Sequence, residues 1–285
     1  MNTIDKVSTS NLLGVILDIE FKKSFKELTL SKDCLKIIEE NGIKLEKIVI
    51  GEFSGRDSAA AIIKAFENED IDAVLPILGF TGTDYGEKEI FYRNWDVINK
   101  KIKESYENKY LLPLHFIFEP KLWNALNGRF VAYAVQKYGY YTPCIGCHAY
   151  LRMLRVPLAK HLGKKIISGE RILHDNDFKI DQFKETLETY YKICEKFDVE
   201  LIFPVKDIEE GSKIKEIIGD NWEQGQNQYS CMFSGNYRDL DGKVIFEKEK
   251  IVKILNEFIY PASIEILKKG YQNNFKYLKT VKKFL

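Results

Sequence analysis

Short apolar runs alternate with helix-like stretches along residues 47–205, and this alternation constrains the fold more than any other feature of the chain. The runs are rich in Ile, Val and Phe, as expected of strands that helices cover on both faces. The strands are predicted at residues 47–53, 72–80, 111–118, 164–170 and 199–205. The helices are predicted at residues 57–68, 92–107, 120–137, 145–162 and 181–197. This order predicts an α/β fold with a five-stranded parallel sheet and helices on both faces.

Two extensions flank the predicted α/β domain, which covers residues 45–240. The N-terminal extension, residues 1–44, is predicted to start with hairpin-like strands within residues 11–30. A helix then follows, with Ser31 suited to cap its start and Gly42 suited to end it.

The C-terminal extension, residues 241–285, has a mostly helical pattern and a basic, aromatic end. We expect it to serve packing or the formation of a homodimer rather than contact with nucleic acid.

The charge balance and the hydrophobic pattern exclude several classes of protein. The 285 residues include 43 Lys and Arg against 42 Asp and Glu, a net charge of +1. A non-specific nucleic-acid binder usually carries a clear basic excess. No apolar stretch of about 18 residues is present, so no membrane span is expected. The first thirty residues lack the pattern of a signal peptide, which favours the cytoplasm, where thiols stay reduced.

A compact polar turn, Ser-Gly-Arg-Asp-Ser, joins the first predicted strand to an Ala-rich helix. At the carboxyl end of a parallel strand, such a turn directs N–H groups outward at the positive end of the helix dipole, where phosphate binds. Ser54 and Ser58 add hydroxyl groups, and Gly55 lets the backbone approach an oxyanion closely. Arg56 is suited to pair with a phosphate. The alternative is an ordinary helix cap made by Ser54 or Asp57.

This turn resembles the PP-loop of the ATP pyrophosphatase superfamily, whose usual form is Ser-Gly-Gly-x-Asp-Ser. The loop here is one residue shorter, and the match lies on Ser54, Gly55, Asp57 and Ser58. The resemblance covers residues 45–205 and implies the strand order 3-2-1-4-5. It also implies that the chain binds ATP with Mg²⁺ and adenylates a substrate.

Three cysteines form the second signal. Cys144 and Cys147 make a C-x-x-C pair at the start of a predicted helix, a spacing that lets two sulfurs face one metal centre. Cys231 lies in a polar loop after the fifth strand, where it can reach the same edge of the sheet. Three thiolates suit a [4Fe-4S] cluster with one open iron, and His148 would instead complete a Cys₃His zinc site.

The remaining cysteines, Cys34 and Cys194, fall in amphipathic helices and are interpreted as packing residues.

The arrangement of Cys144, Cys147 and Cys231 is similar to that of the iron–sulfur-dependent tRNA 2-thiouridine and 2-thiocytidine synthetases of the same superfamily. In those enzymes a C-x-x-C pair and a distant cysteine hold a cluster whose open iron carries the attacking sulfur. The resemblance assigns catalytic roles to Asp57 and to the three cysteines. It implies sulfide or a carrier protein as sulfur donor, and a tRNA base or a small molecule as acceptor.

The loop after the fourth strand is the remaining candidate for ligand contacts. By the resemblance, Gly169, Glu170 and Arg171 would face ATP, Mg²⁺ or substrate, and Glu170 would hold Mg²⁺. His174 and Asp175 are suited to acid–base or orienting roles. The alternative is a plain loop in which Asp175 or Asp177 caps a helix.

Two further segments are candidates on weaker signals. By the resemblance, the Gly-containing loop at residues 81–84 would position adenine and ribose. Arg152 and Arg155 would face the cluster or a phosphate, unless they lie on a solvated helix face.

These patterns together predict an ATP-dependent, iron–sulfur-dependent sulfurtransferase. Three alternatives remain open: a PP-loop ligase or amidase with a structural zinc, a cluster-dependent desulfidase, and a non-catalytic sensor of nucleotide or cluster.

Overall fold

The computed structural model describes residues 30–175, 177–219, 222, 229–269 and 276–285. Residues 11–29 of the predicted hairpin-like start therefore lie outside the described residues. The next element is confirmed: α2 (Lys32–Glu40) begins after Ser31, whose hydroxyl accepts from the Cys34 N–H at 3.2 Å. Gly42 follows the helix with a positive φ of 59°, a conformation that glycine adopts without strain.

The central sheet confirms the predicted α/β class. Its strands are β1 (Ile48–Glu52), β2 (Ala73–Phe80), β4 (Tyr110–Leu111), β5 (His115–Phe118), β6 (Lys165–Ile167) and β7 (Glu200–Ile202). All pairings are parallel in the order β4-β2-β1-β6-β7, with β5 also paired to β2. The predicted third strand is interrupted around Pro113, which has no N–H for the ladder. Counting β4 and β5 as that third strand, the order is the expected 3-2-1-4-5.

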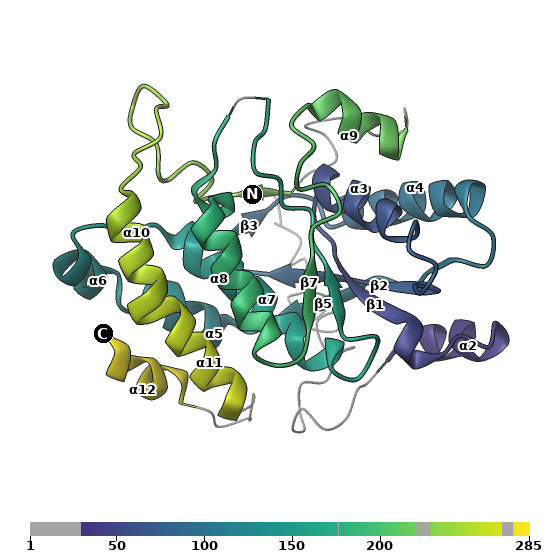
Figure 1. Cartoon of the computed structure of the whole chain (residues 1–285), viewed down its shortest axis with the longest axis horizontal. Helices are drawn as coiled ribbons and strands as arrows, with labels where there is room; N and C mark the ends of the chain where they lie inside the picture. Colours follow the sequence, from purple (N-terminus) through teal and green to yellow (C-terminus); the bar gives the residue numbers. More distant parts are fainter. Residues whose placement is uncertain (1–29, 176, 220–221, 223–228, 270–275) are drawn as a thin grey trace, which may run out of the picture.

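Helices cover both faces of the sheet (Figure 1). One face packs against α3 (Arg56–Ala65), α4 (Glu89–Ser105) and α9 (Gly211–Ile218), and the other against α2, α7 (Pro143–Ala159) and α8 (Lys184–Glu195). Side chains alternate along each strand. Val49 and Val74 enter the first core, between the sheet and α3, α4 and α9, whereas Ile50 and Leu75 enter the second core, between the sheet and α2, α7 and α8. A helix at α9 was not among the predicted elements.

The second core extends into the C-terminal helices, which confirms that the described part of this extension is helical. These elements are α10 (Lys248–Ile254), a π-helical turn η4 (Leu255–Ile259), α11 (Tyr260–Lys269) and α12 (Tyr277–Val281). The helix predicted at residues 120–137 is divided into α5 (Pro120–Trp123), a π-helical turn η2 (Asn124–Gly128) and α6 (Val131–Tyr138), which pack into the same core. Helix α11 packs against α7 and α8, beside which it lies in Figure 1. Among the described helices, none has the length and apolar character needed to span a bilayer.

A small antiparallel ribbon lies outside the main sheet. It pairs β3 (Asp84–Tyr85), which follows β2, with β8 (Ser230–Cys231), which lies 146 positions later in the chain. The ribbon brings the late cysteine segment to the carboxyl ends of β1 and β2. Three short 3₁₀ turns complete the described elements: η1 (Leu45–Lys47), η3 (Ile180–Gln182) and η5 (Lys282–Phe284).

Candidate functional site

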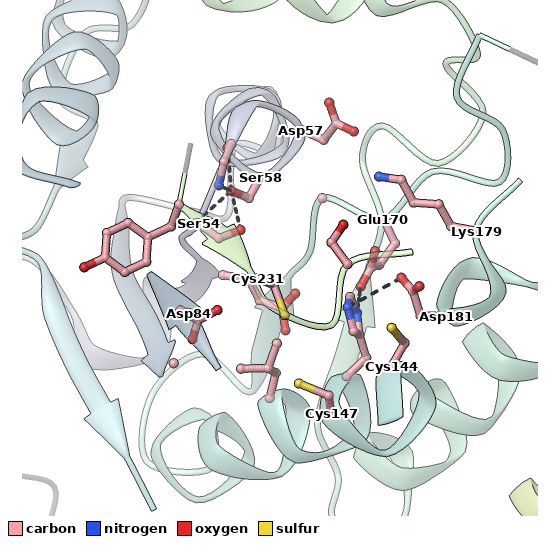
Figure 2. A pocket seen from close by; sticks show the side chains of 18 of the residues that line it. Ser54, Asp57, Ser58, Asp84, Cys144, Cys147, Glu170, Lys179, Asp181 and Cys231 are labelled. Atoms are coloured by element: carbon pink, nitrogen blue, oxygen red, sulfur yellow. Dashed lines mark hydrogen bonds and ion pairs between the residues drawn. The ribbon is translucent and has the colours of Figure 1, made fainter. Parts of the chain in front are cut away.

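A pocket of about 520 Å³ opens at the carboxyl ends of the central strands. The chain runs outward from β1 to β2 on one side and from β6 to β7 on the other, so the β1–β6 boundary is the switch point where ligands bind in open α/β sheets. The residues predicted in the β1–α3 turn, at the three cysteines and at the start of the loop after the fourth strand line this pocket: Ser54, Gly55, Arg56, Asp57, Ser58, Cys144, Cys147, Gly169, Glu170, Arg171 and Cys231. Figure 2 shows the β1–α3 turn facing the three cysteines across it.

The β1–α3 turn has the shape expected of an anion site, but the hydroxyl group of Ser58 already occupies two of its N–H donors. The Ser58 hydroxyl accepts from the N–H groups of Ser54 at 3.0 Å and Gly55 at 3.1 Å. It donates to the Gly55 carbonyl at 2.7 Å. The turn is therefore closed on itself, although by Ser58 rather than by Ser54 or Asp57 as in the helix-cap alternative. A phosphate would have to displace the Ser58 hydroxyl to reach these two amides.

Asp57 lines the pocket, and its carboxylate is paired with positively charged side chains. Its carboxylate contacts Arg56 Nε at 2.9 Å and Arg171 Nε at 2.9 Å, and His174 Nδ1 lies 3.4 Å away. Burial alone would raise the pKa of Asp57, but the Arg171 and Arg56 guanidinium groups outweigh it. They hold the pKa well below its usual range, so Asp57 is a carboxylate at neutral pH.

Arg171 has a different task from the predicted ATP contact. Its guanidinium is fully buried, and it donates to Asp57, to the carbonyls of Ile208 and Glu209 at 2.9 and 2.8 Å, and to His174 at 2.8 Å. All three guanidinium nitrogens are thus engaged by the protein. Arg171 fixes Asp57 to the segment that precedes α9.

Gly169 lets the loop after β6 pack directly against the start of α3. A Cβ atom at this position would lie 2.3 Å from the Ser58 nitrogen and 2.5 Å from the Asp57 carbonyl carbon. These are backbone atoms that cannot move aside, so the position requires glycine. Its predicted place opposite the turn is correct, and its contact is with the turn itself.

The three predicted cysteines converge on the pocket from separate elements. Cys144 and Cys147 lie in the first turns of α7, and Cys231 lies in β8. Each sulfur accepts an N–H hydrogen bond: Cys144 from Asn236 Nδ2 at 3.0 Å, Cys147 from Trp123 Nε1 at 3.3 Å, and Cys231 from the Phe233 backbone at 3.4 Å. Hydrogen bonds of this kind stabilise negative charge on sulfur, as metal-bound thiolates require.

The thiols of Cys144 and Cys147 are protonated when no metal is bound. Burial raises the pKa of Cys144 to about 12 and raises the pKa of Cys147 well above its ordinary value, despite the helix N-terminus. Metal binding would therefore release protons. This environment does not suit a free thiolate nucleophile.

The spacing of the three sulfurs differs from that of a single zinc site. In a tetrahedral zinc site the sulfurs are about 3.8 Å apart, since each Zn–S bond is about 2.3 Å. The three cysteine sulfurs form no group with all members within 4.8 Å of one another, among the residues the structure describes. In an iron–sulfur cluster each thiolate binds a different iron, so its sulfurs need not lie that close together.

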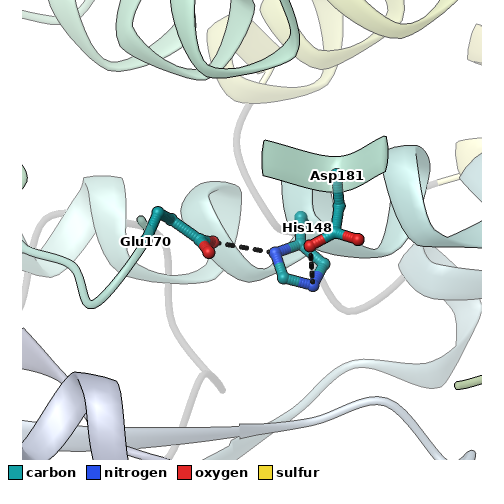
Figure 3. Close-up of side chains that lie close together, drawn as sticks. All are labelled: His148, Glu170 and Asp181. Atoms are coloured by element: carbon teal, nitrogen blue, oxygen red, sulfur yellow. Dashed lines mark hydrogen bonds and ion pairs between the residues drawn. The ribbon is translucent and has the colours of Figure 1, made fainter. Parts of the chain in front are cut away.

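His148 is not directed toward the cysteines, contrary to the Cys₃His alternative. Its Nδ1 lies 2.9 Å from Glu170 Oε1, and its Nε2 lies 3.4 Å from Asp181 Oδ2 (Figure 3). Burial opposes the imidazolium, but the Asp181 and Glu170 carboxylates outweigh it and raise the pKa of His148. The two carboxylates engage opposite nitrogens of the ring as a hydrogen-bonded bridge. One ligand atom from each of the three residues also lies within 4.8 Å of the others, so the group could hold a metal ion.

Glu170 is likewise engaged by side chains, in place of the predicted Mg²⁺. One oxygen contacts His148 and Arg152, and the other accepts from Gln182. Burial would raise the pKa of Glu170, but Arg152 and His148 outweigh it and hold the pKa well below its usual range.

Arg152 and Arg155 are buried, so the solvated-face alternative is wrong. Both pair with Glu52 at the end of β1, at 3.0 and 3.5 Å. Glu52 was not among the predicted site residues, although a carboxylate within an apolar strand is a recognisable signal.

The loop at residues 81–84 holds the ribbon. The Thr83 hydroxyl lies 3.3 Å from Cys231 Sγ, and the Thr83 carbonyl accepts from the Met232 N–H at 2.9 Å. Asp84 accepts from the backbone and hydroxyl of Thr81. This loop thus places the third cysteine, which is a different task from the predicted adenine contact.

Asp175 accepts a hydrogen bond from a distant helix and, within the described residues, does not cap a helix of its own loop. Its carboxylate accepts from the Gly211 N–H at 2.8 Å, at the start of α9. The side chain therefore joins the loop after β6 to a helix that lies much later in the chain.

The chain is 69% identical over 267 residues to the uncharacterized protein MJ0009 of Methanocaldococcus jannaschii. The match covers 94% of this chain and 96% of that protein. The chain belongs to the MJ0009 family. No protein-family model matches it. Because the match spans nearly the whole of both chains, the MJ0009 family has the α/β domain together with its C-terminal helices.

Proposed function

We propose that the protein is an ATP-dependent sulfurtransferase of PP-loop type that uses an iron–sulfur cluster held by Cys144, Cys147 and Cys231. The observation that carries the proposal is the convergence of these three sulfurs on one pocket whose opposite wall is the β1–α3 turn. The pocket volume falls within the range of small-molecule and cofactor sites. The proposal includes a cytoplasmic location, where thiols remain reduced.

Three cysteine ligands leave one iron of a [4Fe-4S] cluster open, and such an iron supplies a binding site for sulfide. The protein's own contribution is to hold the sulfurs and to direct one N–H group at each of them. The supports for the sulfurs come from three separate positions. The Trp123 indole precedes the turn η2, Phe233 lies in the Cys231 loop, and Asn236 follows it.

ATP would place its phosphates against the β1–α3 turn. Rotation of the Ser58 hydroxyl would free the amides of Ser54 and Gly55 for a phosphate oxygen. Arg56 and Lys179 line the same pocket and supply positive charge. Mg²⁺ would be held mainly by phosphate oxygens and water, as is usual for this ion.

The proposed reaction balances with sulfide as the sulfur donor. An oxygen of the acceptor, a tRNA base or a small molecule, attacks the α-phosphate of ATP, forms an O–P bond and releases pyrophosphate. Sulfide, delivered as such or by a carrier protein, then forms a C–S bond at the activated carbon. AMP leaves with the former acceptor oxygen.

Anaerobic purification followed by iron, sulfide and zinc analysis tests the cluster. We expect about four iron and four sulfide per chain. Cys144→Ala, Cys147→Ala and Cys231→Ala should each lose most of the iron, whereas Cys194→Ala, at a buried thiol outside the pocket, should retain it. Stoichiometric zinc without iron, or full iron retention in Cys231→Ala, would overturn the assignment.

A non-catalytic sensor is the second candidate, because the Ser58 hydroxyl already satisfies the two amides of the turn. Pyrophosphate release from ATP separates the two functions. The enzyme should release pyrophosphate in the presence of an acceptor pool of small RNA and metabolites, and Asp57→Ala should abolish this release. A protein that loads with iron but neither binds ATP nor releases pyrophosphate would be a sensor.

A further inference from the structure

A path of polar contacts starts at Asp57 in the β1–α3 turn and leads toward the cysteine helix. Asp57 Oδ2 accepts from Arg171 Nε at 2.9 Å, and Arg171 Nη2 lies 2.8 Å from His174 Nδ1. His174 Nε2 contacts Gln182 Oε1, and Gln182 Nε2 donates to Glu170 Oε2. These groups come from the β1–α3 turn, from residues 170–174 and from residue 182, and all but Asp57 are buried.

The path continues from Glu170 to the helix that carries the cysteines. Glu170 Oε1 lies 2.9 Å from Nδ1 of His148, the residue that follows Cys147 in α7. His148 Nε2 in turn faces Asp181. The β1–α3 turn and the C-x-x-C helix are thus joined by one unbroken series of side-chain contacts.

The chemistry of the donors fixes the direction of the central links. A guanidinium group only donates, so Nδ1 of His174 must accept from Arg171, and the ring hydrogen must lie on Nε2. That hydrogen is donated to Gln182 Oε1, which also faces the Arg171 backbone N–H at 3.4 Å. The Gln182 amide is then oriented with its NH₂ group toward the Glu170 carboxylate.

No member of this path can reorient alone without leaving a buried polar group unpaired, which is costly. A histidine or glutamine at the centre of such a series therefore transmits a change at either end. Among the side-chain hydrogen bonds that the structure describes, those of Gln182 join the Asp57 half to the Glu170–His148 half. The two halves also meet along the backbone, because Glu170 and Arg171 are neighbours in the chain.

We propose that Gln182 and His174 are positioning residues that couple Asp57 in the β1–α3 turn to Glu170 and His148 beside the cysteines. The functional meaning of this link, coordination of ATP binding with sulfur chemistry, rests on the proposed function. The link itself does not, because it consists of side chains of this chain alone.

Nitrogen-15 NMR of the histidine rings in the full chain tests the coupling. The sequence holds four histidines, so the spectrum is simple and each ring can be assigned by substitution. His174 should show the tautomer with its hydrogen on Nε2. Asp57→Asn should shift the ring signals of both His174 and His148. In a Gln182→Met background the same change should still shift His174, but the shift of His148 should fall to the level of the exposed His161.

Thr186→Val is the matched control, because it removes a buried hydrogen bond to the Ile180 carbonyl, 3.2 Å long, that is not part of the path. His148 should respond to Asp57→Asn in this background as in the wild type. If Gln182→Met does not fold, Gln182→Asn replaces it, since its shorter side chain cannot span His174 and Glu170.

An equal response of His148 with and without Gln182, or no response in the wild type, would overturn the inference. The spectra require neither ATP nor iron. If the wild-type protein binds iron but His148 does not respond to Asp57→Asn, this inference alone is overturned. If His148 responds as expected but the protein binds no iron, the proposed function alone is overturned.

Discussion

Single residues in the pocket were easier to identify from the sequence than their partners were. The turn, the C-x-x-C pair and Cys231 each have a local signature, and all of them line the pocket. The partner of Arg171, in contrast, depends on where residues 57, 208 and 209 lie in space. A buried arginine and an arginine that binds phosphate look the same in a sequence, so the role of Arg171 could not be predicted.

Asp57 gives a prediction at this scale, because positive neighbours lower its pKa in the folded state. A carboxylate whose pKa is lower when folded stabilises the protein above its unfolded pKa, about 3.9, and this stability is lost as the pH falls. Asp57→Asn should therefore cost about 3 kcal/mol at neutral pH by leaving buried guanidinium charge unpaired. The difference between variant and wild type should shrink as the pH falls below about 4.

Urea unfolding of both proteins across this pH range measures the difference. Lys36→Gln is a suitable control, since its contact with Glu40 is an exposed pair at 3.8 Å and should contribute little at any pH. A difference for Asp57→Asn that does not change with pH would show that its carboxylate is not stabilised by charge.

Elements were predictable where their pattern is local. Each parallel strand is a short apolar run, so the pattern predicted the fold class, and the resemblance to the PP-loop superfamily predicted the strand order. The ribbon β3–β8 was not predicted, because two strands of two residues each carry no periodicity and pair only across a long stretch of chain. The ribbon nevertheless decides where Cys231 lies.

Gly86 is the residue on which this ribbon depends most visibly. Its φ of 144° is disfavoured for other residues, and a Cβ atom would lie 2.8 Å from the Tyr229 ring, next to β8. Gly86→Ala should displace β8 and expose Cys231. Alkylation of Cys231 in metal-free protein, followed by mass spectrometry, should then be about tenfold faster, corresponding to about 1.4 kcal/mol in the opening equilibrium.

Gly242→Ala provides the control for backbone strain. Gly242 also has a positive φ, 79°, but no heavy atom lies within 4 Å of the place that a Cβ atom would take, and Gly242 is not part of the ribbon. The alkylation rate of Cys231 in this variant should match the wild type. Equal acceleration in both variants would mean that general destabilisation, rather than the ribbon, controls access to Cys231.

At the scale of the whole molecule, the C-terminal extension is part of the main core rather than an appendage. Residues of η4 and α11 share one hydrophobic cluster with α7 and α8, including Phe258 and Ile266. Sequence periodicity predicted helices here but could not show which face of the sheet they would cover. The cysteine helix α7 is thereby packed between the sheet and the C-terminal helices.

Phe258 tests whether this packing makes the described chain one cooperative unit. Its side chain is 1% exposed in η4, so Phe258→Ala should leave a cavity and cost about 4 kcal/mol. If the core is continuous, the loss must reach the pocket, because Trp123 packs against the same cluster and donates to Cys147. The unfolding transitions followed by far-UV circular dichroism and by Trp123 fluorescence, with Trp95 and Trp222 replaced by Phe, should shift together.

Asn256→Ala is the control for this variant. It lies at an exposed position of the same turn and should change stability by less than about 0.5 kcal/mol. A circular dichroism transition that moves while the Trp123 transition stays in place would instead make the C-terminal helices a separately folding unit.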